Sequence, residues 1–288
     1  MITSRTRLLA LLGNPVGHSL SPAMQNAALR HLKIDARYLA FQVERENLPG
    51  ALSGMKVLGV LGVNITVPFK EDAFHLMDRV GDEAEGLGAV NTVVFREGTA
   101  TGFNTDVQGV KGALEALGCG EKSALLLGAG GAGRAAALAL FQEGFLRVFV
   151  SNRHGERAEK LIRDLHTRTR GAEFRTIPWG SPPPAPFGVL VNATSLGLEG
   201  KPWPRECLQV LLDSVRNGKE KVLDMVYRSE GETELVKAAR ERGIPAAGGE
   251  EVLLRQGAAC FRIFTGCDAP LGVMRMALGR PSGEGERA

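Results

Sequence analysis

The sequence has few cysteines and lacks a long apolar run. Four cysteines are spread over 288 residues. They form no CxxC pair and have no neighbouring His pair, so neither a disulfide framework nor a zinc site is indicated. No apolar stretch approaches the roughly 20 residues that a membrane helix requires. These absences exclude a membrane span and predict a soluble protein of the reducing cytoplasm.

A strong excess of charge of one sign is also lacking. The chain has 35 Lys and Arg against 32 Asp and Glu, and its formal net charge is +3. This is far weaker than the basic stripe that binding to phosphate backbones uses, which argues against nucleic acid as a partner. Hydrophobic residues make up 44% and charged residues 23%, as in ordinary globular proteins, so disorder is excluded for the bulk of the chain.

Short apolar runs alternate with segments of helical period, which predicts an α/β protein with mainly parallel sheets. The first hundred residues show strand patterns near 7–12, 37–43, 59–65 and 90–95, and helical patterns near 22–32, 46–56 and 69–78. A helix over 107–118 leads to a second series, with strands near 123–127, 146–151, 173–177, 188–192 and 221–225 and helices near 131–143, 155–166 and 232–242. The second series is typical of a Rossmann-like fold.

These two series predict two domains. We expect residues 1–104 to form a substrate domain and residues 105–247 to form a Rossmann-like nucleotide-binding domain. Residues 248–279 are helical in pattern and no strand follows them, so we expect residues 248–288 to join the first domain. The tail from Ser282 to Ala288 is expected to be frayed.

A glycine-rich run lies between a predicted buried strand and an alanine-rich helix, and comprises Gly128, Ala129, Gly130, Gly131, Ala132 and Gly133. In that context the run matches the dinucleotide-binding fingerprint. We expect Gly128 to make the tight turn, Gly130 to let the backbone approach a pyrophosphate, and Gly133 to let helix and strand pack closely. The alternative is a plain glycine-rich turn without a ligand.

The residues after the next predicted strand favour NADP over NAD. An NAD enzyme places an acidic residue there, against the ribose 2′-hydroxyl. This chain instead has Asn152 and Arg153, with Arg157 one helical turn on. Guanidinium groups bind phosphate oxygens through charge-assisted hydrogen bonds, which suits a 2′-phosphate. The alternative is a solvated basic helix face.

Polar residues in the first series suggest a substrate site. Ser19 and Ser21 are two residues apart in an extended segment, so both hydroxyls can point to one carboxylate beside a helix N-terminus. Taken alone, Ser21 and Asp106 are also ordinary helix N-caps. Lys70 is less ordinary, because Pro68 predicts a helix start that puts this cation in the first turn, where the macrodipole disfavours it by roughly 0.3–1 kcal/mol. A locally unfavourable residue indicates a functional requirement.

Longer motifs point to a family. In the first series they are Gly13–Pro22 (GNPVGHSLSP), Asn64–Lys70 (NITVPFK), Gly88–Thr92 (GAVNT) and Gly102–Asp106 (GFNTD). The glycine run is followed by Asn152-Arg153, Asn192–Gly197 (NATSLG), Asp224–Tyr227 (DMVY) and Gln256-Gly257. In this order, and over nearly the whole chain, the sequence resembles the shikimate dehydrogenases.

The resemblance implies the reversible NADPH-dependent reduction of 3-dehydroshikimate to shikimate, a step of aromatic amino acid biosynthesis, in a cleft between the two domains. It implies that Lys70 stabilises the charge that develops on the substrate carbonyl oxygen, and that Asp106 holds Lys70 and a substrate hydroxyl in place. The implied substrate contacts are Ser19, Ser21, Asn64, Thr66, Lys70, Asn91, Asp106, Tyr227 and Gln256. The implied NADP contacts are Gly128, Ala129, Gly130, Gly131, Ala132, Gly133, Asn152, Arg153, Arg157, Thr194 and Gly249.

The sequence departs from the family pattern at three places. Gln25 stands where His is usual, Arg228-Ser229-Glu230 replaces the Asn-Pro that usually follows Tyr227, and Phe264 stands where Trp is common. The second departure makes Tyr227 the least secure substrate contact.

Other functions remain open from the sequence. One is an NAD-dependent quinate/shikimate dehydrogenase, against which Arg153 argues. Another is a noncatalytic NADP- or shikimate-binding regulator, against which the presence of both Lys70 and Asp106 argues. A folate-type dehydrogenase would not need the serine pair. The oligomeric state also stays open, a homodimer included.

Overall fold

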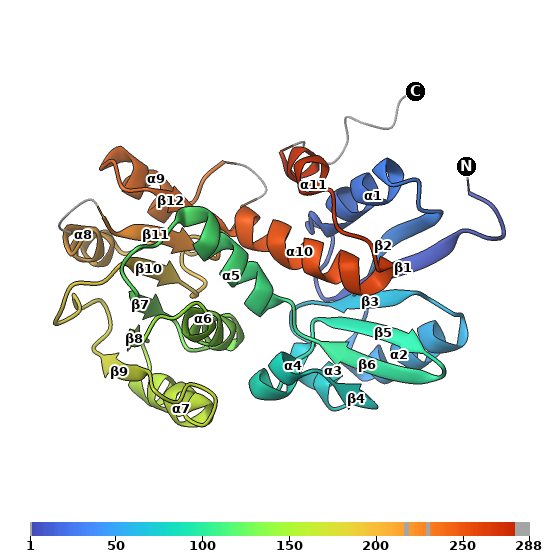
Figure 1. The fold of residues 1–288 in the computed structure, drawn as a ribbon, viewed down its shortest axis with the longest axis horizontal. Helices are drawn as coiled ribbons and strands as arrows, with labels where there is room; N and C mark the ends of the chain where they lie inside the picture. The colour runs from blue at the N-terminus through green and yellow to red at the C-terminus, as the bar shows by residue number, and fades with distance from the viewer. Residues whose placement is uncertain (1, 216–218, 229–230, 280–288) are drawn as a thin grey trace. The chain divides into compact units, whose positions relative to one another are not determined.

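The chain folds into two compact units (Figure 1). The computed structural model describes residues 2–215, 219–228 and 231–279. The first unit comprises Met1–Thr105 and Gln256–Ala288, and the second comprises Asp106–Arg255. The chain returns to the first unit within one helix, α10 (Gly249–Thr265). The tail from Ser282, which we expected to be frayed, lies outside the described residues.

The first unit is built on a six-stranded mixed sheet with the order β2-β1-β3-β5-β6-β4. Its strands are β1 (Arg7–Gly13), β2 (Ala36–Gln42), β3 (Gly62–Ile65), β4 (Arg79–Val80), β5 (Thr92–Arg96) and β6 (Thr99–Phe103). β1 runs parallel to β2 and β3, and β4 runs parallel to β6. β5 is antiparallel to β3 and β6. The sheet is therefore mainly parallel, as predicted, with one antiparallel strand inserted.

Helices cover this sheet, and their bounds are α1 (Ser21–His31), η1 (Arg45–Asn47), α2 (Leu48–Val57), α3 (Lys70–Phe74), α4 (Asp82–Leu87) and α11 (Leu271–Leu278). Leu52 of α2, Ala73 of α3 and Ala84 of α4 join Val63 and Val93 of the strands in one buried cluster. The C-terminal helix α11 packs against α1, and the two lie side by side in Figure 1.

Three short elements of the first unit, β4, β6 and α4, were not predicted, whereas β5 matches the strand predicted near 90–95. β5 and β6 form a hairpin whose two turn residues, Glu97 (φ 49°) and Gly98 (φ 73°), both have positive φ, as the tightest hairpin turns require. The helix predicted over 69–78 is wrong in length, because it ends at Phe74 and the chain enters β4 at Arg79. Elements as short as β4 and α4 carry too few residues to show a period.

The second unit contains an all-parallel sheet with the order β12-β11-β10-β7-β8-β9. Its strands are β7 (Ser123–Leu127), β8 (Arg147–Ser151), β9 (Glu173–Ile177), β10 (Val189–Asn192), β11 (Lys221–Asp224) and β12 (Ala246–Ala247). The chain leaves β7 in one direction through β8 and β9, and then continues on the other side through β10. The predicted Rossmann-like fold is confirmed, and β7 marks the point where the strand order reverses.

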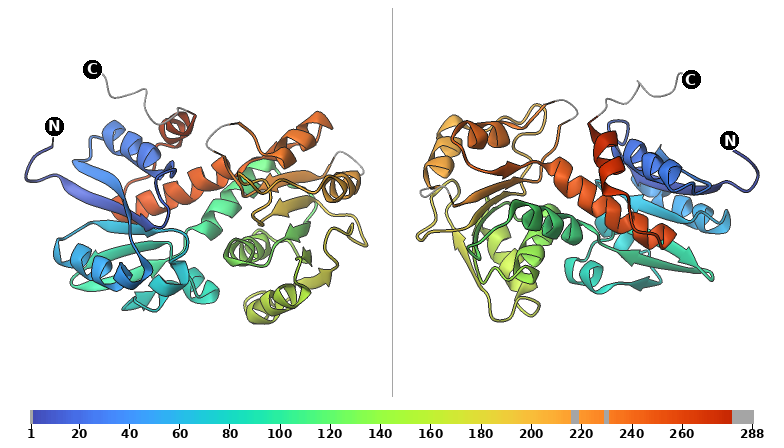
Figure 2. Two further views of the ribbon diagram at one scale, coloured as in Figure 1. Left: turned by 180° about the vertical axis from the view of Figure 1, so that it is seen from behind. Right: turned by 45° about the horizontal axis from the view of Figure 1, so that its top comes forward.

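The helices of this unit are α5 (Asp106–Leu117), α6 (Gly131–Gln142), α7 (Gly155–Leu165), α8 (Arg205–Asp213), α9 (Glu234–Glu241) and the first part of α10. α5 and α6 pack side by side, as both views of Figure 2 show. α8, which was not predicted, shares a buried cluster with α9 and the sheet through Leu211, Leu235 and Leu125.

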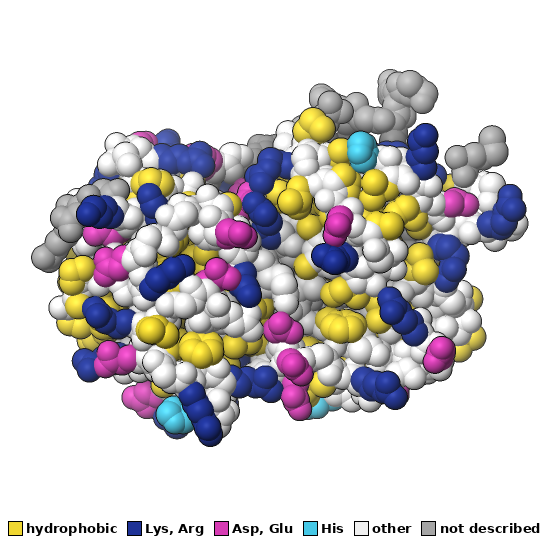
Figure 3. Space-filling view, viewed as in Figure 1, with side chains coloured by type: hydrophobic (Ala, Val, Ile, Leu, Met, Phe, Trp, Pro, Cys, Tyr) yellow, Lys and Arg dark blue, Asp and Glu magenta, His cyan; other side chains and the backbone are white. Residues whose placement is uncertain are grey.

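The surface agrees with the low net charge of the sequence. On the face drawn in Figure 3, basic and acidic side chains are interspersed rather than gathered by sign. Among the described residues, no helix has the length and apolar character that would let it cross a bilayer.

Candidate active site

The loops that follow β1 and β3 meet at the carboxyl end of the first sheet. The amide of Thr66 donates to the carbonyl of Leu12 (2.9 Å), and the amide of Asn14 donates to the carbonyl of Val67 (3.0 Å). A side chain at Gly13 would overlap the Thr66 methyl group, so this close approach requires glycine. The serine loop and the Asn64–Lys70 motif therefore begin from one edge of the sheet.

The serine pair lies at the start of α1. The helix begins at Ser21 with Leu20 in the N-cap position, so the predicted N-cap role of Ser21 is wrong. Pro22 suits the first turn, because its fixed φ is helical and it has no amide to leave unpaired. The Ser19 Oγ accepts a hydrogen bond from the amide of Ser21 (3.3 Å). Both serine side chains are half-buried.

Lys70 is the first residue of α3, so the predicted position in a first helical turn is confirmed. Its carbonyl accepts a hydrogen bond from the amide of Val90 (2.8 Å), which holds it beside the GAVNT motif. Asp72, in the same turn, is bound by Arg45 in an ion pair of 2.6 Å. The Lys70 side chain is half-buried.

A buried amide network joins three of the predicted motifs. Asn64 Nδ2 donates to the carbonyl of Asn91 and to Thr92 Oγ1, both at 3.0 Å. Asn91 Oδ1 accepts from Thr92 Oγ1 (2.9 Å) and from the amide of Thr105 (2.8 Å). Asn64 and Asn91 are therefore brought together, and their amide groups have fixed orientations.

Two further side chains that sequence reasoning missed complete this network. Tyr38 Oη donates to Asn64 Oδ1 (2.8 Å), and the Cys260 thiol lies within donating distance of the same oxygen (3.5 Å) and of the Gly257 carbonyl (3.1 Å). Burial raises the pKa of Tyr38 well above its usual value and that of Cys260 to about 12, so both groups are neutral donors. Gln25, where the family usually has His, donates to the carbonyl of Gly257 (2.9 Å) and to Cys260 Sγ (3.2 Å).

Gln256 contacts Thr105, and Asp106 follows Thr105 in the chain. Thr105 Oγ1 lies 3.3 Å from Gln256 Oε1, which links Gln256 to the Asn91 group. Asp106 follows Thr105 directly and is the first residue of α5. Asp106 is therefore not the residue that precedes the helix, and its carboxylate lies in the first turn, where the macrodipole favours it.

In the second unit, the glycine run connects β7 to α6 at the point where the strand order reverses. Gly128 has φ 102°, and a side chain there would come within 2.7 Å of the Ala193 carbonyl oxygen. A side chain at Gly133 would overlap the carbonyl of Gly128, so helix and turn pack as closely as the fingerprint requires. Gly130 and Gly131 face open space. No protein atom lies within 4 Å of a Cβ added at Gly130 or Gly131, so nothing there blocks the approach of a pyrophosphate to the first amides of α6.

The predicted phosphate-binding arginines follow β8. Asn152 Nδ2 donates to the carbonyl of His154 (2.8 Å), which shapes the turn into α7. Arg153 and Arg157 are exposed at this turn, and within the described part of the chain neither forms an ion pair. The arrangement leaves both guanidinium groups able to bind a 2′-phosphate.

Other cations nearby are already paired. Arg134 and Lys160 both bind Asp164, at 2.6 and 2.7 Å, and these contacts lower the pKa of that carboxyl. Lys160 therefore has an acidic partner, whereas the phosphate-binding role of Arg153 and Arg157 stays a prediction.

The remaining predicted residues lie at the carboxyl ends of β10 and β11. Thr194 follows β10, and its Oγ1 donates to Asn192 Oδ1 (2.7 Å). The amide of Gly249 donates to the carbonyl of Val226 (3.1 Å), and a side chain at Gly249 would overlap that backbone. Tyr227 is half-buried next to this contact. Of the segment that departs from the family pattern after Tyr227, Ser229 and Glu230 lie outside the described residues.

Together these features are those of a dinucleotide-dependent oxidoreductase: a glycine-rich turn lies at the reversal point of a parallel sheet, exposed arginines follow the next strand, and a separate α/β unit holds Lys70 on a motif whose asparagine, Asn64, joins a buried amide network. Three family models match the chain. They are the shikimate dehydrogenase substrate binding domain (residues 11–93), shikimate / quinate 5-dehydrogenase (112–177) and the shikimate 5'-dehydrogenase C-terminal domain (249–278).

Individual proteins are similar over almost the whole length. A shikimate dehydrogenase (NADP(+)) of Aquifex aeolicus is 40% identical, with 95% of this chain and 96% of that protein covered. One of Anaeromyxobacter sp. (strain K) is 42% identical, with 96% and 98% covered. The crystal structure of shikimate 5-dehydrogenase from Thermus thermophilus, in complex with NADP(H) and shikimate, is 38% identical with a TM-score of 0.83, and 96% and 99% of the chains are covered. The chain belongs to the NADP-dependent shikimate dehydrogenase family.

Proposed function

We propose that this protein catalyses the reversible NADPH-dependent reduction of 3-dehydroshikimate to shikimate, with the first unit as substrate domain and the second as NADP domain. The observation that carries the proposal is the gathering of Lys70, Asn64 and Asn91 at one edge of the first sheet. Relatives whose names state this activity cover nearly the whole chain.

The substrate is held by the first unit with help from Asp106 and Tyr227. Ser19 and Ser21 present half-buried hydroxyls beside the N-terminus of α1, which suits a carboxylate. Thr66, Asn91 and Gln256 bind the remaining polar groups. Asn64 already bonds through both amide hydrogens and its carbonyl oxygen, so a substrate hydroxyl must replace one of these partners.

The chemistry requires a group that stabilises negative charge on the carbonyl oxygen. NADPH supplies the hydride for the reduction when it is bound. Lys70, whose side chain is half-buried, then stabilises the developing alkoxide and can deliver a proton from Nζ. Asp106 orients Lys70 and the neighbouring substrate hydroxyl. Both residues are catalytic in this proposal because they touch the reacting groups.

The cofactor is held by the second unit. The segment Gly128–Gly133 and the amides of α6 bind the pyrophosphate, and Asn152, Arg153 and Arg157 bind the adenosine 2′-phosphate. Thr194 and Gly249 border the cofactor at the ends of the next strands. The space at Gly130 and the free arginines support this assignment.

An absorbance assay at the nicotinamide band tests the function. Shikimate and quinate are each offered with NADP and with NAD. The proposal expects the highest kcat/KM for shikimate with NADP, and a preference for quinate with NAD would contradict it. A homodimer and a cytoplasmic location stay predictions, which sedimentation and cell fractionation would check.

A further inference from the structure

A buried carboxylate that the proposed mechanism does not use lies at the end of β11. Asp224 has no exposed surface. Its Oδ2 accepts a hydrogen bond from Thr233 Oγ1 (2.6 Å), and its Oδ1 accepts from Asn192 Nδ2 (2.7 Å) and the amide of Val226 (3.1 Å). Complete burial of a carboxylate costs free energy unless hydrogen bonds compensate for it, so the position of Asp224 indicates a structural or functional requirement.

Asn192 transmits the contact to the loop that follows β10. Asn192 is the direct strand partner of Asp224 and is likewise fully buried. Its Oδ1 accepts from the amide (3.0 Å) and the hydroxyl (2.7 Å) of Thr194, and its Nδ2 also donates to the carbonyl of Leu196 (3.1 Å). The amide of Leu196 in turn donates to Thr194 Oγ1 (3.0 Å). The buried side chain of Asn192 therefore fixes the conformation of residues 193–196.

This loop borders the cofactor turn. A side chain at Gly128 would lie 2.7 Å from the carbonyl oxygen of Ala193 and 3.1 Å from the Thr194 methyl group. A shift of residues 193–194 therefore changes the space beside the first glycine of the dinucleotide fingerprint.

We propose that Asp224 is a positioning residue for NADP, because its carboxylate fixes Asn192, and Asn192 fixes the loop of residues 193–196 against Gly128. The proposal rests on the proposed function, since it concerns the same cofactor. In this proposal Asp224 does not touch the cofactor, and its effect on the loop of residues 193–196 passes through Asn192.

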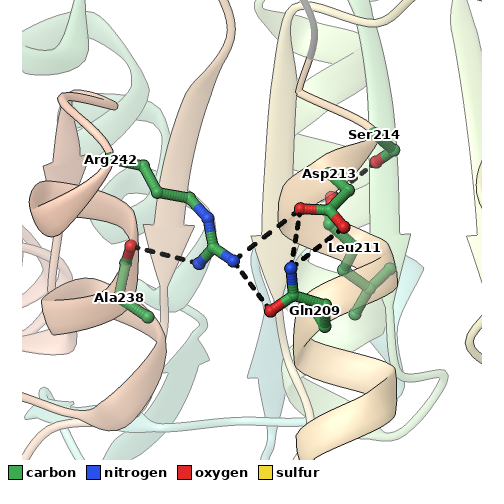
Figure 4. A network of polar contacts seen from close by, with 6 residues as sticks. All are labelled: Gln209, Leu211, Asp213, Ser214, Ala238 and Arg242. Atoms are coloured by element: carbon green, nitrogen blue, oxygen red, sulfur yellow. Dashed lines mark hydrogen bonds and ion pairs between the residues drawn. The ribbon is translucent and has the colours of Figure 1, made fainter.

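Helix α9, which contacts Asp224, is held by side-chain contacts at both of its ends. Thr233 is the N-cap of α9, and its hydroxyl binds Asp224. At the other end of the helix, Arg242 binds Gln209 (3.0 Å) and Asp213 (3.7 Å) of α8, as Figure 4 shows. Asp213 is therefore an acidic residue of the same unit that contacts the end of α9 but not the loop of residues 193–196. This makes Asp213→Ala a matched control.

The charge on Asp224 gives the proposal a pH signature. Burial, with a contribution from Glu250 at the start of α10, raises the pKa of Asp224 to about 6. Burial, with a contribution from Glu250, also raises the pKa of the nearby Tyr227. The pKa of Glu250 itself is raised by burial, and Arg240 lowers it in part. Between pH 5 and 8, Asp224 therefore changes from a protonated group with weaker hydrogen bonds to a carboxylate with charge-assisted ones.

The first experiment measures hydrogen exchange at the amides of Thr194 and Leu196 without cofactor, and NADP Kd by calorimetry. Asp224→Ala should speed exchange at both amides and weaken NADP binding by about tenfold or more, since hydrogen bonds to a charged group are lost. Asp224→Asn should restore only part of both properties, because its amide oxygen can still accept from Asn192 while Thr233 reverses its hydroxyl, but the charge is lost. Asp213→Ala should behave as wild type. Exchange at the wild-type rate in Asp224→Ala would overturn the proposal.

The second experiment follows the ratio of NADP Kd between Asp224→Asn and wild type from pH 5 to 8, which cancels titration of the ligand itself. Wild type should bind about fivefold more tightly above pH 7, and the ratio should approach unity at pH 5. Thr233→Val removes a donor to the carboxylate and should move the midpoint to higher pH. A ratio of unity at every pH overturns the proposal, and this comparison decides the question even if Asp224→Ala does not fold.

The two proposals fail in different ways. If wild type does not bind NADP, the proposed function fails, while hydrogen exchange at Thr194 and Leu196 still decides whether Asp224 holds the loop. If wild type binds NADP but the Asp224 variants change neither exchange nor the pH dependence, the positioning role fails and the proposed function stands.

Discussion

Replacement of Lys70 by alanine tests the proposed chemistry most directly. The backbone bond from Val90 to the Lys70 carbonyl (2.8 Å) does not depend on the side chain, so the site should keep its shape. A positioned acid-base group contributes about 10²–10⁴-fold, so kcat should fall by that factor. This corresponds to about 2.7–5.4 kcal/mol in activation free energy. The affinity for shikimate should change much less, because the interaction is made mainly in the transition state.

The same substitution should lower kcat strongly but should affect stability only slightly. Lys70 is a cation in the first turn of α3, and its removal relieves an unfavourable dipole interaction of about 0.3–1 kcal/mol, so Tm should change little. Glu71→Ala in the same turn is the matched control: Tm should fall slightly and kcat should stay near that of wild type. Turnover by nicotinamide absorbance, shikimate Kd by calorimetry and Tm by scanning calorimetry separate these effects. Near-native kcat in Lys70→Ala would refute the catalytic assignment.

Three further predictions concern binding. Arg153→Ala should raise the KM for NADP by about 10–150-fold, because about 1.5–3 kcal/mol of charge-assisted contact is lost, and should barely change the KM for NAD. Lys160→Ala is the control. Equal losses with both cofactors would contradict the 2′-phosphate assignment. Ser19→Ala with Ser21→Ala should weaken shikimate binding and leave NADP binding unchanged, and a similar loss for an analogue without the carboxylate would show that the serines only support the helix. Gly133→Ala should weaken NADP binding, measured as Kd, because its new methyl group would overlap the backbone of the cofactor turn; unchanged affinity would show that the turn can adjust.

Local signals in the sequence predicted much of the fold. The parallel strands of the second unit are buried apolar runs, and the turn between β7 and α6 needs glycines that act on their immediate neighbours. The position of Lys70 in a first turn was also predicted correctly, although the helix begins at Lys70 itself and the proline expected to open it lies outside. Ser21 shows the limit of such reasoning, because the start of α1 moved by one residue and the serine lost its predicted capping role.

Contacts between distant residues were decided by the tertiary structure. Tyr38 and Cys260 bind Asn64 from a strand and a helix far away in the chain, and neither residue carries a signal of that role in its own segment. Asp224 meets Asn192 because β10 and β11 pair in one register, which the sequence of either strand alone does not specify. Periodicity, turns and helix starts depend on neighbours a few residues apart, so the sequence by itself determined them. The buried hydrogen-bond networks depend on which strands become neighbours, and only the folded chain sets that.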